Sequence, residues 1–185
     1  FGTDSFDALY KKYEKDSSIN KKTIPAQNLF SDLLKERAET GRIYIMNLDH
    51  CNTHSSFKDK VSMSNLCQEI TLPTTPINAI DDSQGEIALC ILSAINVGQL
   101  NNLEDLENLC ELAVRALEEI IEYQDYPVKA AEVSTKSRRS LGIGYIGLAH
   151  YLAKQGFKYS EKGAWDSVDR LTEAVSLSLL ESEAE

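Results

Sequence analysis

The chain has 185 residues, of which 42% are hydrophobic and 26% charged, so one domain with its own core is expected. A formal net charge of −10 disfavours nucleic acid and anionic membrane surfaces as partners, because both attract clusters of lysine and arginine. No apolar run reaches the about 20 residues needed to span a bilayer, and the N-terminus lacks a signal-like pattern.

The four cysteines, at positions 51, 67, 90 and 110, are too few and too scattered for a disulfide-stapled secreted protein. A reducing, cytoplasmic location fits them better. The chain also begins without methionine and stops within an apparent helix, so we expect a piece of a longer protein.

Residues 1–40 are predicted to form a helical lead-in. Apolar side chains recur every three or four residues between 5 and 15, which is typical of an amphipathic helix. A second helix is expected from Thr23, as its N-cap, and Pro25 to about Glu39, where Thr40 and Gly41 end it.

Residues 41–100 are predicted to hold strands and a loop that carries the chemistry. The run 42–48 is almost continuously apolar, which predicts a buried strand. The polar residues 49–54 follow it and include His50, Cys51 and His54. Zinc is a weak interpretation because a second ligand pair is missing, which leaves an active-site rim or a plain loop; no metal site is expected.

The stretch 64–70 reads Ser-Asn-Leu-Cys-Gln-Glu-Ile, and the prolines that follow favour extended backbone. In an extended segment Asn65, Cys67 and Glu69 share one face, which places a thiol between an amide and a carboxylate. The alternative is that Cys67 is a small buried hydrophobe and Glu69 a solvated charge.

The apolar run 86–96 predicts an interior strand with Cys90 at its centre, where an inert core thiol is one interpretation. Residues 101–185 are predicted to be mainly helical, with helices at 101–124, 128–136, 148–155 and 165–185. Cys110 lies on the buried stripe of the first of these helices. The cationic residues 136–139 are expected to form a solvated turn.

Glycines at 142, 144 and 147 match a dinucleotide-binding fingerprint only in spacing, since no long strand precedes them. Close packing of a strand against a helix explains them better. About three strands beside five or more helices predict an α/β fold, and so few strands suggest a partial domain.

Three segments, 41–52, 64–70 and 85–94, together resemble the large catalytic subunit of class I ribonucleotide reductase, and 125–127, 138–144 and 151–154 continue the match. The resemblance covers nearly the whole chain and implies the central segment of a ten-stranded α/β barrel. It makes 1–185 a single partial domain in which a finger loop carries the catalytic cysteine.

The resemblance assigns Cys67 as the thiyl-radical cysteine, Glu69 as the base and Asn65 as the amide that binds substrate, with Ser64 beside them. Cys90 becomes one half of the reducing dithiol, whose other half lies outside this chain. A Glu69 shielded from water would have a raised pKa and could accept a hydroxyl proton.

The implied substrate is a ribonucleoside diphosphate. The implied partners are the remainder of the large subunit, a small subunit whose di-metal centre supplies the radical, and thioredoxin or glutaredoxin as reductant. No cofactor is expected to bind this segment, and ATP and dNTP effectors would bind elsewhere in the subunit. The chain alone is predicted to be inactive.

Two other functions compete with this one. A non-catalytic scaffold or interaction fragment would keep the fold without the chemistry, but it needs none of Asn65, Cys67, Glu69 and Cys90. A two-electron thiol–disulfide enzyme would use Cys67 and Cys90, but the chain has no Cys-x-x-Cys motif.

Overall fold

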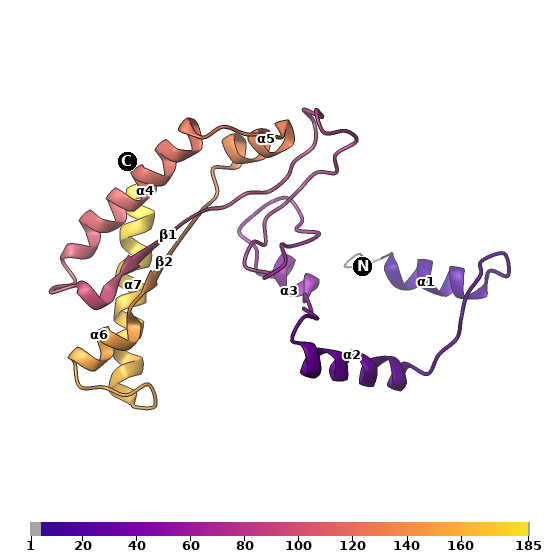
Figure 1. Ribbon diagram of the computed structural model, residues 1–185, viewed down its shortest axis with the longest axis horizontal. Coiled ribbons are helices and arrows are strands. Elements are labelled where there is room, and N and C mark those ends of the chain that lie inside the picture. Colours follow the sequence, from indigo (N-terminus) through magenta and orange to yellow (C-terminus); the bar gives the residue numbers. More distant parts are fainter. Residues whose placement is uncertain (1–4, 185) are drawn as a thin grey trace. The chain divides into compact units, whose positions relative to one another are not determined.

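The computed structural model describes residues 5–184, which fall into two compact units divided after Thr75. Figure 1 shows the elements of each unit. Whether residues 1–185 belong to a single partial domain, as the sequence predicts, stays a prediction.

The first unit contains three helices: α1 (Phe6–Lys15), α2 (Ala26–Thr40) and α3 (Leu48–Thr53). Both helices of the predicted lead-in are therefore confirmed, but the N-cap of α2 is Pro25 and not Thr23. Gly41 ends α2 in the left-handed conformation, with φ of 65°, and its N–H donates to the Arg37 carbonyl at 2.9 Å. None of the residues in these helices is buried, so this unit has little core of its own.

The predicted strand at 42–48 is wrong. Residues 42–47 have no regular structure, Leu48 begins α3, and Tyr44 and Ile45 are each 48% exposed. A strand needs a neighbour for its backbone groups, and the described residues provide none for this run. The polar residues after it form α3 instead of a loop at the end of a strand.

The second unit is built on two parallel strands, β1 (Ile91–Asn96) and β2 (Leu141–Ile146), paired from Ile91 with Leu141 to Asn96 with Ile146. The connection runs through a short 3₁₀ turn, η1 (Val97–Gln99), and the helices α4 (Asp105–Tyr123) and α5 (Lys129–Arg138). Parallel strands require such a crossover. The predicted strand at 86–96 is confirmed only in its second half.

Two helices follow β2: α6 (Leu148–Lys154) and α7 (Lys162–Ala184). All four helices predicted beyond residue 100 are therefore present, each within a few residues of its predicted ends. The last residue of the predicted final helix, Glu185, lies outside the described residues.

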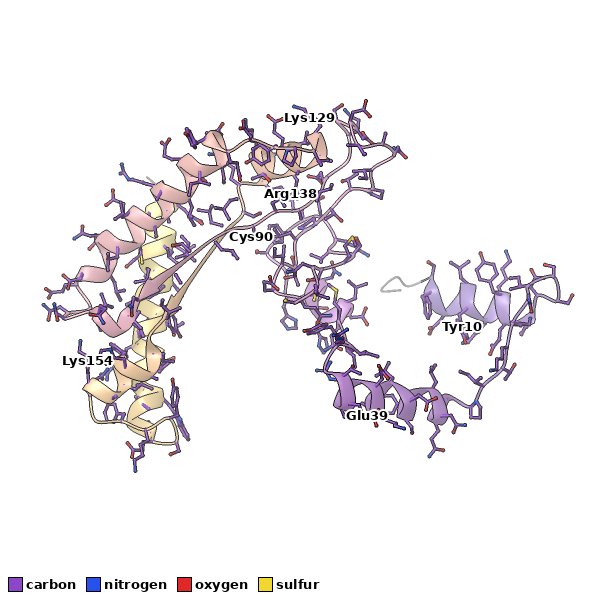
Figure 2. All side chains as sticks on the ribbon, viewed as in Figure 1. Tyr10, Glu39, Cys90, Lys129, Arg138 and Lys154 are labelled. Atoms are coloured by element: carbon purple, nitrogen blue, oxygen red, sulfur yellow. The ribbon has the colours of Figure 1, made fainter. Side chains whose placement is uncertain are left out.

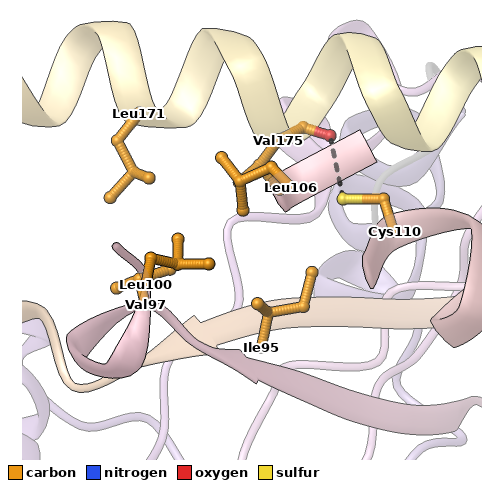
Figure 3. Close-up of a cluster of buried hydrophobic side chains, with 7 residues drawn as sticks. All are labelled: Ile95, Val97, Leu100, Leu106, Cys110, Leu171 and Val175. Carbon is orange, nitrogen blue, oxygen red and sulfur yellow. Dashed lines mark hydrogen bonds between the residues drawn. The ribbon is translucent and has the colours of Figure 1, made fainter. Parts of the chain in front are cut away.

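The core of the second unit lies where α4 and α7 pack on β1 and η1, and Figure 3 shows its side chains. Cys110 is fully buried there, with its Sγ 4.0 Å from the Val175 carbonyl oxygen, and burial raises the pKa of this thiol. The prediction that Cys110 is a core residue is confirmed. The cluster comprises Ile95, Val97, Leu100, Leu106, Cys110, Leu171 and Val175.

The described residues form seven α-helices and one two-stranded parallel sheet, which is a mixed α/β arrangement that does not close into a barrel. One strand fewer than predicted is present, because 42–48 is not a strand. None of the helices among residues 5–184 combines the length and the apolar character needed to cross a membrane.

Candidate active site

The 64–70 loop is a tight turn and not the extended segment predicted from its sequence. The Gln68 N–H donates to the Asn65 carbonyl at 3.2 Å, and Gln68 has a positive φ of 64°. A positive φ is uncommon for a residue with a side chain and marks a sharp reversal. The prediction that Asn65, Cys67 and Glu69 share one face of an extended segment is therefore wrong.

Two side chains close the base of this turn. The Ser64 hydroxyl donates to the Ile70 carbonyl at 2.8 Å, and the Asn65 Oδ1 accepts the Ile70 N–H at 3.0 Å. Since both bonds link the start of the loop to its end, they hold the intervening residues together as a projecting tip. Asn65 thus has a structural role in addition to the one predicted from the sequence.

The tip presents its reactive groups to solvent. Cys67 and Glu69 are both exposed, and Leu66 between Asn65 and Cys67 is 77% exposed. Exposure makes the thiol and the carboxylate accessible, and it overturns the interpretation of Cys67 as a small buried hydrophobe. Glu69 is in contact with solvent, so the shielding from water that its predicted role requires is not provided within this unit.

The chain that leads to the loop is fixed to α3 by one asparagine. The Asn52 Oδ1 accepts the Val61 N–H and its Nδ2 donates to the Val61 carbonyl, both at 2.9 Å. Val61 itself is only 2% exposed. This pair of bonds imitates a strand pairing, and it secures the backbone three residues before Ser64.

His50 lies in α3 and His54 is the C-cap of this helix. His50 and His54 lie edge to face with ring centroids 6.4 Å apart, and the His54 Nδ1 is 3.3 Å from the His50 carbonyl oxygen. Among residues 5–184, no three His, Cys, Asp or Glu side chains are grouped so that they could hold a metal ion. The weak zinc interpretation of this stretch therefore has no geometric support.

Cys90 lies in the second unit, directly before β1, and is half-buried. Its Sγ lies 3.9 Å from the Ile91 carbonyl oxygen. On the neighbouring strand Gly142 leaves room for this sulfur, because a Cβ built on Gly142 would lie 2.9 Å from Sγ. The Cys90 sulfur therefore lies against Gly142 of β2, just before the start of β1, and is not part of the hydrophobic core.

Gly142 and Gly147 serve close packing, as the sequence favoured, whereas nothing lies within 4 Å of a Cβ built on Gly144. Gly147 has φ of 77° and caps α6, and a Cβ on it would meet the Asn96 Oδ1 at 2.5 Å and the Gly98 nitrogen at 3.0 Å. A dinucleotide-type turn would begin after the strand, whereas Gly142 and Gly144 lie within β2.

Substituting Gly142 is expected to displace the Cys90 sulfur. In Gly142→Ala the new methyl group would lie 2.9 Å from Sγ and 2.6 Å from the Leu92 Cδ2, so both side chains must move. We expect the rate at which iodoacetamide alkylates Cys90 to change several-fold, because the added methyl group displaces the sulfur. Gly144→Ala is the matched control, because nothing lies within 4 Å of its added methyl group. Equal alkylation rates for the two variants would contradict the packing of the Cys90 sulfur against Gly142.

The cationic residues 138 and 139 are not a solvated turn, so that prediction is wrong. Arg139, at the end of α5, donates from Nε to Glu118 at 2.6 Å and from Nη1 to Glu122 at 2.7 Å. These hydrogen bonds raise the pKa of the Arg139 guanidinium, Glu118 contributing most. Arg138 pairs with Glu86, 52 residues earlier in the chain, a contact that no local sequence pattern could reveal.

The predicted site residues thus fall into two groups. Ser64, Asn65, Cys67 and Glu69 share one turn in the first unit, and Cys90 lies beside Gly142 in the second.

Comparison with known proteins places this geometry in context. The family model described as "Ribonucleotide reductase, barrel domain" matches residues 1–185. The alpha subunit of ribonucleoside-diphosphate reductase from Buchnera aphidicola (subspecies Schizaphis graminum) is 54% identical over 183 residues, covering 97% of this chain. The corresponding Haemophilus influenzae protein is 54% identical over 182 residues, covering 97% of this chain. Subunit alpha of ribonucleoside-diphosphate reductase 1 from Escherichia coli is 52% identical over 185 residues, covering 98% of this chain. The chain spans about 24% of the length of each of these relatives.

Proposed function

Because this chain belongs to the ribonucleotide reductase family, as part of its barrel domain, we propose that it is a central segment of the catalytic subunit. In that role it reduces ribonucleoside diphosphates to deoxyribonucleotides by thiyl-radical chemistry, and only together with the rest of the subunit. The two parallel strands would then be part of a ten-stranded barrel, and the 64–70 loop its finger loop.

The tip of the 64–70 loop would carry the first steps. A thiyl radical at Cys67 takes the 3′-hydrogen of the ribose, which is feasible because S–H and ribose C–H bonds are close in strength. Glu69 accepts the proton of the 3′-hydroxyl as a general base. Asn65 hydrogen-bonds the sugar hydroxyls without adding charge, and Ser64 lies beside it as a further substrate contact.

Cys90 would take part in the reduction itself. The 2′-hydroxyl leaves as water, and carbon 2′ gains a hydrogen in its place. Two thiols, Cys90 and one elsewhere in the subunit, supply two electrons and two protons and become a disulfide. Cys67 finally returns a hydrogen to carbon 3′ and becomes a thiyl radical again. Thioredoxin or glutaredoxin would reduce the disulfide, and a di-metal small subunit would supply the radical.

One observation carries this proposal: an exposed thiol and an exposed carboxylate lie two residues apart on a turn whose backbone is fixed by hydrogen bonds. A scaffold has no need to present these groups. In the first unit the tip is open to water, so a closed substrate pocket would be completed by other parts of the subunit. Closure there would exclude water from the site of proton transfer to Glu69.

A substitution at Glu69 tests the proposal. In the full-length subunit with its radical-bearing partner, Glu69→Gln is expected to lower the kcat for reduction of a ribonucleoside diphosphate by about 10²–10⁴-fold, the usual contribution of a general base. The glutamine keeps the size of the side chain but cannot accept the proton. The measurement is deoxyribonucleotide formed per minute.

Glu39→Gln is the matched control, because Glu39 lies on α2 with a side chain 61% exposed and far along the chain from the loop. Its turnover is expected to equal that of the unsubstituted protein. Equal turnover of Glu69→Gln and Glu39→Gln would refute the general-base role. A full-length protein that forms no deoxyribonucleotide at all would instead favour the scaffold.

A further inference from the structure

Cys90 lies in a segment, residues 86–90, that has no regular secondary structure. Residues 86–90 form an irregular connection between the turn at 78–85 and β1. At its downstream end, the Ile91 N–H donates to the Ser140 carbonyl at 3.3 Å, which begins the pairing with β2. Without further support, such a segment would be free to shift its backbone, and the sulfur with it.

The upstream end of the segment is held by an ion pair with α5. The Arg138 Nε donates to the Glu86 Oε1 and its Nη2 to the Glu86 Oε2, each at 2.9 Å. The two side chains are only 20% and 12% exposed. A backbone bond lies beside them, because the Ile87 N–H donates to the Ala130 carbonyl at 3.1 Å.

The form of this contact fixes position as well as charge. Two parallel N–H···O bonds join the planar guanidinium to the carboxylate, so they set the orientation of both groups. Partial burial reduces screening by solvent. The turn before Glu86 is itself rigid: the Asp82 carboxylate accepts the N–H groups of Asn78 at 2.9 Å and Gln84 at 2.8 Å.

The sulfur has little freedom on its other side. A Cβ at position 142 would already lie 2.9 Å from the Cys90 Sγ, so the thiol occupies the space that the glycine leaves on β2. A displacement of the 86–90 segment would move Sγ along or away from this strand. Figure 2 labels Arg138 and Cys90 in the same part of the second unit.

We propose that the Glu86–Arg138 ion pair is a positioning pair that fixes the backbone carrying the Cys90 thiol, so that the thiol meets its disulfide partner. This inference rests on the proposed redox role of Cys90. In this role the pair acts through the four residues between Glu86 and β1, and not through a contact with substrate. Its loss should slow formation of the Cys90 disulfide while leaving substrate binding intact.

The test uses the full-length subunit with its radical-bearing partner and the variants Arg138→Gln and Glu86→Gln. We expect kcat to fall about tenfold or more, as small misplacements of reacting groups cost up to about 10²-fold, with KM for the ribonucleoside diphosphate unchanged within about twofold. We also expect the rate of Cys90 alkylation by iodoacetamide, followed by mass spectrometry of its peptide, to change several-fold in the resting protein. Arg138→Lys keeps the charge and loses the bidentate geometry, so its kcat should lie between those of Arg138→Gln and the unsubstituted protein.

Arg115→Gln is the matched control. Arg115 pairs with Glu111 at 2.7 Å on the surface of α4, with a side chain 68% exposed, so its loss should alter neither kcat nor alkylation. Unchanged Cys90 alkylation in Arg138→Lys and Arg138→Gln would overturn the positioning role, even where kcat falls. Unchanged kcat in both would overturn it as well.

A Cys90→Ser variant separates this inference from the proposed function. If that variant keeps full turnover, the redox role of Cys90 fails, and the positioning role in the reaction fails with it. If Cys90→Ser is inactive while both Gln variants behave like Arg115→Gln, the proposed function stands and only the inference fails.

Discussion

Replacing Cys67 by serine in the full-length subunit is expected to abolish deoxyribonucleotide formation, with a loss of more than about 10⁴-fold, the scale on which essential reacting groups act. A serine O–H bond is much stronger than a ribose C–H bond, so an oxygen radical would not form from the incoming radical under the same conditions. Cys67 is exposed on its turn, and the substitution removes no packing. Protein stability should therefore be unchanged, and the measurement is turnover beside a thermal unfolding curve.

Cys110→Ala provides the contrasting case within the same chain. Cys110 is fully buried between α4 and α7, so its truncation leaves a small cavity and should lower the free energy of unfolding by about 1 kcal/mol. Turnover should persist. The two variants thus separate chemistry from packing. Cys67→Ser is expected to lose activity and keep its stability, whereas Cys110→Ala is expected to keep activity and lose stability. Retained turnover in Cys67→Ser would rule out the radical role of this cysteine.

Replacing Cys90 by serine is expected to stop net reduction almost as completely, but at a later step. A hydroxyl cannot form a disulfide, so the two electrons needed after loss of the 2′-hydroxyl are not supplied. We expect multiple-turnover product to fall by more than about 10³-fold, again the behaviour of an essential reacting group.

The stage of the block can be measured with substrate labelled with tritium at carbon 3′. A hydrogen taken by the Cys67 thiyl becomes part of an S–H group, which exchanges with water. Tritium release should therefore persist in Cys90→Ser and disappear in Cys67→Ser. If Cys90→Ser keeps net reduction, the dithiol does not include this residue. If it releases no tritium, the substitution disturbs the first step, and the assignment of a later role is wrong.

Helices were the most predictable part of this fold. Their apolar side chains recur with the helical period, and local signals such as Gly41 and Pro127 mark their ends. Cys110 was predicted to lie on the buried stripe of α4, and it is buried there together with Leu106 and Val114. Such patterns survive tertiary context because a helix satisfies its backbone hydrogen bonds internally.

Strands and loops were less predictable, because their backbone partners are distant. The run 42–48 has the composition of a buried strand but no neighbour among the described residues, and it is irregular. The 64–70 loop has residues suited to extended backbone, yet Ser64 and Asn65 both bond to Ile70 and close a turn. The short helix α3 was missed because its six residues are too few to show a period.

By itself the sequence determined the helical periods, the candidate site residues and the family of the chain, since these depend on residue types and their order. Only the tertiary structure decided that Cys67 projects from a turn, that Cys90 rests against Gly142, and that Glu86 meets Arg138. The last two contacts join residues about 50 positions apart in the chain, and β1 and β2 bring them together. Such contacts depend on the pairing of strands and the packing of helices, which no local pattern of residues specifies.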